Sequence, residues 1–243
     1  MTVVAVLGLG EAGGAIAADL RSAGAPTRGF DVLPERTMAA SMADAVSGAD
    51  VVLSLTSAES ALDAARSALG TLADGAVYAD ANTGSVALKQ ELAGLVGDRF
   101  ADVALMAPVP GRGVRTPALA SGPAAERFAA ALRPLGMPVD VVGAEPGVAA
   151  GRKLLRSVVW KGVAAVVVEA LAAGRAAGAE PFVREQIAQL VPGGDIERME
   201  HASRLHARRR AHEMADVAAQ LRELGVEPRM TDAARELLEA LDG

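Results

Sequence analysis

The chain has 243 residues and no cysteine, which excludes disulfides, thiol catalysis and cysteine-based zinc sites. Its formal net charge of −6 offers no global source for the phosphate neutralisation that drives nucleic-acid binding, so we expect no nucleic-acid partner. Hydrophobic residues make up 51% of the chain but aromatic residues only 2%, so Ala, Val and Leu must fill the core. This composition is typical of closely packed helices and buried parallel strands.

The beginning of the chain carries no basic segment, and its apolar run is soon interrupted by glycines and Glu11. A signal peptide needs a basic start and an uninterrupted apolar run, and a membrane helix needs about 20 apolar residues. We therefore expect a soluble, cytoplasmic protein that has no membrane partner.

Short apolar segments alternate with helical patterns through the first part of the chain. We predict strands at residues 2–7, 27–31, 49–55, 75–81, 99–108, 118–122 and 138–143. Helical patterns lie between most of them, including residues 11–24 and 123–134. This alternation predicts a doubly wound parallel sheet. The segment between Asp31 and Ala49 is short, so we expect an element there to be trimmed.

From Glu145 onward the chain shows helical patterns alone. The first, over residues 147–178, is apolar on nearly all sides, which is typical of a helix buried between domains or subunits. Further helices are predicted at 180–190 and 194–224, and a last one near Thr231, a candidate N-cap. The fold class is therefore an α/β Rossmann-like domain over residues 1–144 followed by an all-α domain over 145–243.

The glycines of "VLGLGEAGGAI" follow the first predicted strand and open a helix. In a dinucleotide-binding turn Gly8 permits the tight turn, Gly10 lets a pyrophosphate approach the backbone, and Gly13 lets helix and strand pack closely. The alternative is a tight strand-to-helix turn without a ligand. The residues predicted to bind a dinucleotide here are Gly8, Leu9, Gly10, Glu11, Ala12 and Gly13.

Asp31 ends the next strand and occupies the position from which a carboxylate takes the adenosine ribose hydroxyls. Its charge favours NAD, because it repels the 2′-phosphate of NADP. Arg28 and Arg36 lie nearby, so NADP stays an alternative cofactor. The bland alternative is a solvated aspartate.

Lys153 lies early in an apolar helix, where the positive end of the helix dipole disfavours a cation. Burial would lower its pKa toward a range useful for exchanging a proton with a carbonyl oxygen. Ser157 shares its helical face, and Lys161 follows one step further along. The alternative is that Lys153 reaches solvent or pairs with an acidic neighbour.

Two other places hold candidate anion-binding arginines. The loop over 107–117 follows a predicted strand and carries Gly111 and Arg112 between prolines, so it is either a ligand loop or an ordinary surface loop. In the helix over 194–224, the apolar stripe aims Arg210 inward, where it completes a buried ion pair or anchors an anionic substrate. The three histidines, all between 201 and 212, lack carboxylates at zincin-like spacing, so we expect no metal site.

Taken together, "GLGEAGG", "VYADANTGS", "MAPVPGRG" and "GVAAGRKLLRS" resemble the β-hydroxyacid dehydrogenase superfamily, which includes 3-hydroxyisobutyrate and 6-phosphogluconate dehydrogenases. The resemblance covers essentially the whole chain. Its helical half, with "KLLRSVVWKG" and "HARRRAHEM", looks like a subgroup whose C-terminal domain has no assigned function.

The resemblance implies a Rossmann-like domain and a helical domain that builds a homodimer, with the active site in the cleft between them. Lys153 falls on the family's catalytic lysine. The residues that fall where the family contacts the nicotinamide half of the cofactor are Leu55, Thr56, Asn82 and Thr83. Family members turn over small 3-hydroxy acids.

The chain departs from the family pattern around the substrate. Pro110, Gly111 and Arg112 stand where a Ser-Gly-Gly loop is usual, and Ser157 stands where an asparagine usually follows the lysine. His212 and Glu213 replace a Lys-Asp pair. The substrate pocket is therefore expected to be rebuilt.

Our leading hypothesis is an NAD(P)-dependent oxidoreductase that acts on a small, anionic hydroxy or keto compound. Lys153 would exchange the proton, Ser157 and Gly111 would position the substrate beside Pro110, and Arg112 or Arg210 would hold its negative group. The alternatives are a dinucleotide-binding sensor or assembly protein without catalysis, and an imine reductase. Retention of Lys153 favours oxygen chemistry over imine reduction.

Overall fold

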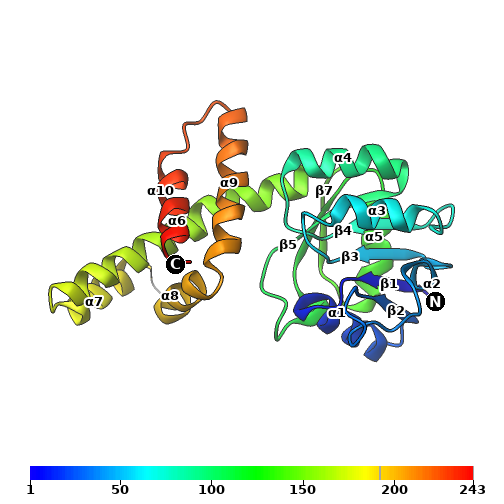
Figure 1. Cartoon of the computed structure of the whole chain (residues 1–243), viewed down its shortest axis with the longest axis horizontal. Coiled ribbons are helices and arrows are strands. Elements are labelled where there is room, and N and C mark those ends of the chain that lie inside the picture. The colour runs from blue at the N-terminus through cyan, green and yellow to red at the C-terminus, as the bar shows by residue number, and fades with distance from the viewer. Residues whose placement is uncertain (192, 243) are drawn as a thin grey trace. The chain divides into compact units, whose positions relative to one another are not determined.

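The computed structural model describes residues 1–191 and 193–242. Its contacts divide the chain into two compact units, Met1–Lys153 and Leu154–Gly243 (Figure 1). The boundary lies inside one continuous helix, α6, which spans Val148–Ala176.

The first unit is built on a seven-stranded sheet in the order β2-β1-β3-β4-β5-β6-β7. Each strand pairs with its neighbour in parallel, except that β5 and β6 are antiparallel. The strands are β1 (Val4–Leu7), β2 (Thr27–Phe30), β3 (Val51–Ser54), β4 (Val77–Asp80), β5 (Phe100–Leu105), β6 (Ala118–Ser121) and β7 (Val139–Gly143).

The antiparallel pair corrects the prediction of a wholly parallel sheet. A parallel neighbour requires a crossover that returns the chain to the starting edge, usually through a helix. Between β5 and β6 the chain forms a loop with the short 3₁₀ turn η2 (Gly113–Arg115), and no crossover helix. The chain therefore reverses direction at this point.

Helices cover both faces of the sheet, as its doubly wound pattern requires. On one face, α1 (Glu11–Ser22) and α5 (Ala125–Leu132) pack through residues such as Ile16 and Phe128. On the other, α3 (Ala61–Leu69) and α4 (Val86–Val96) pack through alanines, Leu92 and Val96. The 3₁₀ turns η1 (Gly97–Arg99) and η3 (Arg133–Leu135) follow α4 and α5.

The segment between β2 and β3 is trimmed, as predicted. Its helix, α2, covers just Met42–Val46. The residues before it fold back along β2, where the N–H groups of Met38 and Ala39 both donate to the carbonyl of Gly29.

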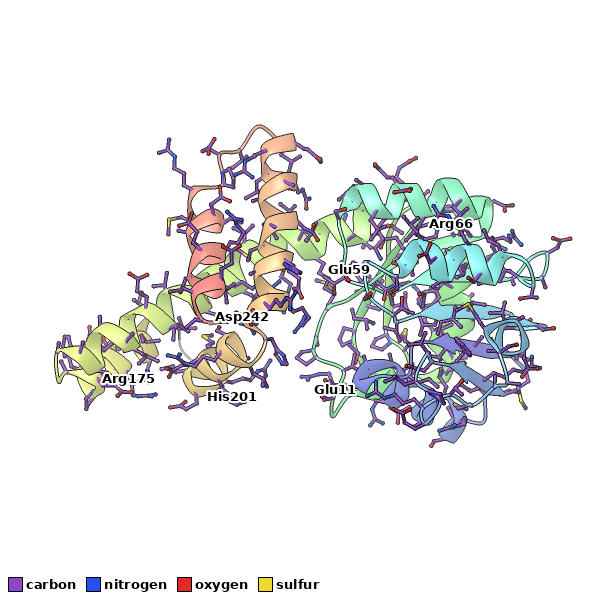
Figure 2. The ribbon with its side chains drawn as sticks, viewed as in Figure 1. Glu11, Glu59, Arg66, Arg175, His201 and Asp242 are labelled. Atoms are coloured by element: carbon purple, nitrogen blue, oxygen red, sulfur yellow. The ribbon has the colours of Figure 1, made fainter. Side chains whose placement is uncertain are left out.

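The second unit contains the rest of α6 together with α7 (Glu180–Leu190), α8 (Ile196–Leu205), α9 (Ala207–Glu223) and α10 (Arg229–Ala240). Val167 and Leu171 of α6 pack with Ile187 and Ile196. Arg175, near the end of α6 (Figure 2), donates to Glu180 of α7 and Glu200 of α8. These contacts join three helices at one end of the unit.

Two boundaries in this unit correct the sequence prediction. The helix expected over 194–224 is two helices, because His206 leaves the helical region with φ −120° and ψ 27°. Thr231 is not an N-cap, since α10 begins at Arg229 after Pro228, and the threonine is buried within the first turn. A proline at a helix start loses no internal hydrogen bond, which favours the earlier beginning.

By length and composition alone, α6 could cross a membrane, and 39% of its most apolar 18-residue window is buried. The core helix of a soluble protein meets the same criteria. The cluster around Val167 and Leu171 shows that one side of α6 packs within the second unit.

Candidate functional site

The glycine-rich turn joins β1 to α1 at the carboxyl edge of the sheet. Gly8 has φ +88°, and a Cβ on it would lie 2.4 Å from the carbonyl oxygen of Leu55. A Cβ on Gly13 would lie 1.8 Å from the carbonyl oxygen of Gly8. Packing therefore excludes a side chain at both positions.

Gly10 differs from these two glycines because the protein leaves space beside it. A Cβ there would meet one atom within 4 Å, the terminal Nη1 of Arg36, at 3.9 Å. Gly10 is also the N-cap of α1 and offers no side-chain cap to the helix N–H groups. Glu11, in the first helical turn, is exposed (Figure 2). This open helix N-terminus fits the pyrophosphate of a dinucleotide.

Asp31 follows β2 and holds the turn. One carboxylate oxygen accepts from the N–H of Leu9 at 2.6 Å, and the other accepts from the N–H of Leu33 at 2.9 Å. The structure thus brings Asp31 to the glycine-rich turn, with Arg36 close to Gly10.

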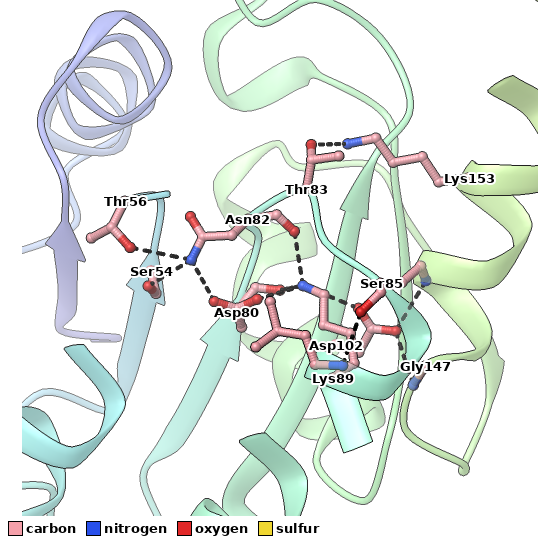
Figure 3. A network of polar contacts seen from close by, with 12 residues as sticks. Ser54, Thr56, Asp80, Asn82, Thr83, Ser85, Lys89, Asp102, Gly147 and Lys153 are labelled. Carbon is pink, nitrogen blue, oxygen red and sulfur yellow. Dashed lines mark hydrogen bonds and ion pairs between the residues drawn. The ribbon is translucent and has the colours of Figure 1, made fainter. Parts of the chain in front are cut away.

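Asn82 follows β4 and contacts residues at the end of β3. Its Nδ2 lies 2.6 Å from Asp80 Oδ1, 3.2 Å from Ser54 Oγ and 3.3 Å from Thr56 Oγ1 (Figure 3). The side-chain oxygen of Asn82 points away from these partners (Figure 3). The loops after β3 and β4 are therefore tied together at the carboxyl edge, where open α/β sheets bind their ligands.

Lys153 lies on the first two turns of α6 and is partly buried. Its Nζ donates to Thr83 Oγ1 at 2.9 Å (Figure 3). The sequence places these two residues 70 positions apart. The fold thus joins the predicted catalytic lysine to a residue predicted to face the nicotinamide.

Beneath this contact lies a buried cluster that the sequence analysis missed. Lys89 of α4, which is 1% exposed, forms ion pairs with Asp80 of β4 and Asp102 of β5, both fully buried. Burial alone would lower the pKa of Lys89, but the charges of Asp80 and Asp102 outweigh that effect and raise it. Lys89 therefore stays charged inside the domain.

A signal for this cluster was present in the sequence. Asp80 and Asp102 each interrupt a strand whose other residues are apolar or small, and all four residues of β4 and all six of β5 are buried. An aspartate in a fully buried strand requires a partner. The sequence does not say which of the chain's cations supplies it.

The loop over 107–117 is fixed at one end and exposed at its tip. Asp19 of α1 accepts from the N–H of Val114 at 3.0 Å, and Gly113 packs closely on the same carboxylate. The predicted substrate-binding residues Pro110, Gly111 and Arg112 are all exposed.

Ser157 and Arg210 belong to the second unit. Ser157 is 7% exposed. Arg210 is partly buried, as its phase in the apolar stripe predicts, and its Nη1 donates to Ser203 Oγ at 2.9 Å. Burial lowers the pKa of Arg210, and the neighbouring Arg209 adds to the effect. The charge of Glu213 opposes this shift.

Lys161 and Glu213 form a second ion pair that the sequence analysis did not predict, with Arg209 as a further partner of Glu213. Burial lowers the pKa of Lys161, although the charge of Glu213 opposes this. Within residues 1–191 and 193–242, no three His, Asp or Glu side chains are grouped so that they could hold a metal ion.

Comparisons with known proteins identify the fold. Residues 174–241 match a domain of unknown function, DUF1932. A conserved hypothetical protein from Sinorhizobium meliloti is 31% identical, with 99% of this chain and 88% of that chain covered and a TM-score of 0.77. The conserved protein MTH1747, of unknown function and structurally similar to 3-hydroxyacid dehydrogenases, is 30% identical, with 98% and 96% covered and a TM-score of 0.76.

The chain belongs to the β-hydroxyacid dehydrogenase superfamily. Within it, the chain falls in the subgroup whose C-terminal helical domain has no assigned function. Mycobacterium tuberculosis 3-hydroxyisobutyrate dehydrogenase has the same fold at 19% identity, with 99% of this chain and 93% of that chain covered and a TM-score of 0.80.

The superfamily fold is also shared with imine reductases and reductive aminases at 18–22% identity and TM-scores of 0.62–0.68. Among these structures, one reductive aminase is in complex with NADPH and one imine reductase variant with NAD+. No curated protein sequence matches the chain.

The close contact between Gly13 and Gly8 predicts that a side chain at position 13 destabilises the protein. Gly13→Ala forces a Cβ against a backbone oxygen, and overpacking of this kind costs about 1–3 kcal/mol. Gly94→Ala is the matched control, because this helical glycine in α4 has nothing within 4 Å of the added Cβ. That variant should gain about 0.5–1 kcal/mol from helix propensity.

Urea unfolding of the two variants measures both effects. Equal free energies of unfolding for Gly13→Ala and Gly94→Ala would contradict the close packing of the turn.

Proposed function

We propose that this protein is an NAD(P)-dependent oxidoreductase that acts on the CH–OH or keto group of a small, anionic compound. The observation that carries the proposal is the bond from Lys153 Nζ to Thr83 Oγ1 at 2.9 Å. It lies at the carboxyl edge of the sheet that also carries the glycine-rich turn. An amine at this edge can exchange a proton with a substrate oxygen.

The residues at this edge fit a dinucleotide. Gly10 offers open space at a helix N-terminus, and Asp31 offers a carboxylate beside the turn. Leu55, Thr56, Asn82 and Thr83 follow β3 and β4, where we assign the nicotinamide half. When bound, the nicotinamide supplies or takes the hydride, while this chain binds, orients and moves the proton.

Lys153 is the residue to which we assign the proton at the substrate oxygen. Thr83 Oγ1 accepts one of the hydrogens of this amine and so holds it at the carboxyl edge of the sheet. In the direction of reduction, the ammonium form of Lys153 donates a proton to the carbonyl oxygen and becomes the neutral amine. In the direction of oxidation, it takes that proton back from the hydroxyl.

We assign the substrate's negative group to an arginine. Arg210 of the second unit is partly buried and donates to the hydroxyl of Ser203, and a guanidinium in this setting suits an anion anchor. Arg112, at the exposed tip of the 107–117 loop, is the other candidate. Pro110, Gly111 and Ser157 complete the set of residues that we propose to position the substrate.

Because the chain shares its fold with imine reductases, reduction of an imine is a second candidate reaction. An imine needs a proton on nitrogen, and it needs no group that stabilises a negative oxygen. The lysine amine held at Thr83 favours oxygen chemistry, because an ammonium stabilises the charge that develops on a carbonyl oxygen.

Replacement of Lys153 tests the proposed activity. Lys153→Ala should lower kcat by about a hundredfold or more, because general acid–base catalysis contributes that much, while cofactor affinity stays within about threefold. Nicotinamide absorbance at saturating cofactor measures turnover over a panel of hydroxy acids, aldehydes, ketones and imines. Arg152→Ala, at the exposed neighbouring position, is the matched control and should retain activity.

A fall of less than about tenfold in Lys153→Ala would exclude the proton-transfer role. Tight cofactor binding without turnover on any compound of the panel would instead favour a sensor or assembly protein.

Asp31 predicts a preference for NAD. Its carboxylate repels a 2′-phosphate, so we expect NADH to bind about tenfold more tightly than NADPH in calorimetric titration. Asp31→Asn removes the charge, keeps an oxygen acceptor for the N–H of Leu9, and should lose most of this preference. Arg36→Ala is the counterpart, which should weaken NADPH binding alone. Tighter binding of NADPH by the unaltered protein would overturn the assignment.

We also propose that the protein is a homodimer formed through α6. The second unit has an apolar groove of about 540 Å³, lined mainly by α6 and α10. Exposed apolar side chains lie in it, with Val159 63%, Val166 56%, Leu190 83% and Met230 69% exposed. A contiguous apolar surface of this kind typically marks an interface.

Sedimentation equilibrium measures this association directly. We expect a mass near twice that of the 24.6 kDa chain. Val166→Glu places a charge in the groove and should give a monomer, while Ala215→Glu, on an exposed position of α9, should leave the dimer intact. A monomeric unaltered protein would refute the proposal.

A further inference from the structure

Lys89 is buried in the first unit, where it contacts Asp80 at the end of β4, Asn82 in the loop that follows and Asp102 of β5. Its Nζ donates to the Asp80 carboxylate, to the Asp80 main-chain oxygen at 3.0 Å, and to the Asn82 main-chain oxygen at 2.9 Å (Figure 3). The same nitrogen lies 3.5 Å from Asp102 Oδ1. One cation therefore neutralises two buried carboxylates and binds the loop that follows β4.

On the β4 side, these bonds fix the loop that carries Thr83. Asp80 Oδ1 accepts from the Asn82 side chain, while Lys89 holds the Asn82 main chain. Both the backbone and the side chain of Asn82 are thus fixed immediately before Thr83, which accepts the bond from Lys153.

On the β5 side, Asp102 holds the beginning of α6. Its Oδ2 accepts from the N–H of Gly147 at 3.2 Å and from the N–H of Ala150 at 3.0 Å. Ser121 of β6 donates to the same oxygen and accepts from the N–H of Ala149. A carboxylate at this place also compensates the positive end of the helix dipole. Lys153 follows Ala150 by three residues on the helix fixed in this way.

The two sides of the cluster thus meet at the bond between Lys153 and Thr83. We propose that Lys89, acting through Asp102 and the loop after β4, is a positioning residue that holds the Lys153 amine against Thr83. This inference rests on the proposed function for its catalytic consequence, but the position of the amine can be measured without turnover.

Because the chain has few lysines, the position of the Lys153 amine can be measured directly. The chain has three lysines, Lys89, Lys153 and Lys161. Lys89 is buried, and Lys161 belongs to the second unit, where it pairs with Glu213. Acetylation by a dilute activated ester, followed by peptide mass spectrometry, reports the reactivity of Lys153, with Lys161 as the reference in the same molecule.

Asp102→Asn is the principal variant, because it keeps the size and an acceptor oxygen but removes the charge that attracts Lys89. We expect acetylation of Lys153 to rise about fivefold or more relative to Lys161, because the amine is released from Thr83, and kcat to fall about ten- to hundredfold with the KM for cofactor within threefold. Asp50→Asn is the matched control, since Asp50 also accepts a backbone N–H, from Val3, before β3 begins. It should change neither quantity.

Lys89→Met tests the cation itself but leaves two buried carboxylates, which can unfold the domain. The Lys89→Met/Asp102→Asn double variant is therefore measured beside it, and Lys89→Arg should restore part of the wild-type behaviour. Thermal melting and cofactor titration identify the variants that are folded.

Two outcomes would overturn the positioning role. One is a folded Asp102→Asn or double variant in which Lys153 acetylation, relative to Lys161, stays within twofold of the wild type. The other is an equal rise for Lys153 and Lys161, which indicates general loosening of the protein. If the unaltered protein turns over none of the panel, the proposed function fails, yet the acetylation result still decides the position of the amine.

Discussion

The ion pairs of Lys89 with Asp80 and Asp102 are the constraint on which the site depends. Removing an ammonium and two carboxylates from water carries a large desolvation penalty, and well-packed apolar residues in their place are often equally stable or more so. Apolar residues, however, cannot form the hydrogen bonds that orient neighbouring groups. Here the carboxylates orient Asn82 and hold the first turn of α6, so the charges set geometry at the carboxyl edge of the sheet.

Much of this edge could be predicted from the sequence, because a parallel sheet brings the residues that follow its strands to one place. Gly8 and Asn82 each follow a predicted strand and Asp31 ends one, so their proximity follows from the topology alone. The position of Lys153 beside Thr83 does not follow from the topology of the sheet in this way. Nothing in its local sequence brings it to Thr83, and the prediction relied on the resemblance to the superfamily, while the structure supplies the contact.

The features that escaped prediction share a physical cause. Helical hydrogen bonds continue on both sides of His206. The apolar positions of α8 and α9 therefore follow one helical periodicity, and the sequence gives no sign of the break between the two helices. Between β5 and β6 a loop with the 3₁₀ turn η2 takes the place of a crossover helix, so the chain reverses direction there. The partner of Asp102 depends on which cation the fold delivers. Apolar periodicity reports which residues face the core; it does not report a backbone break, the direction of a strand or the partner of a buried charge.

The division of the chain within α6 has a consequence for dissecting the protein. The strands end at Gly143, which makes the following loop the obvious place to separate the two halves. A fragment cut there would lose the N–H groups of Gly147 and Ala150, and with them two of the hydrogen bonds that the buried Asp102 carboxylate accepts. The sheet half keeps these buried hydrogen bonds only when it includes the opening turns of a helix whose remainder serves the other half.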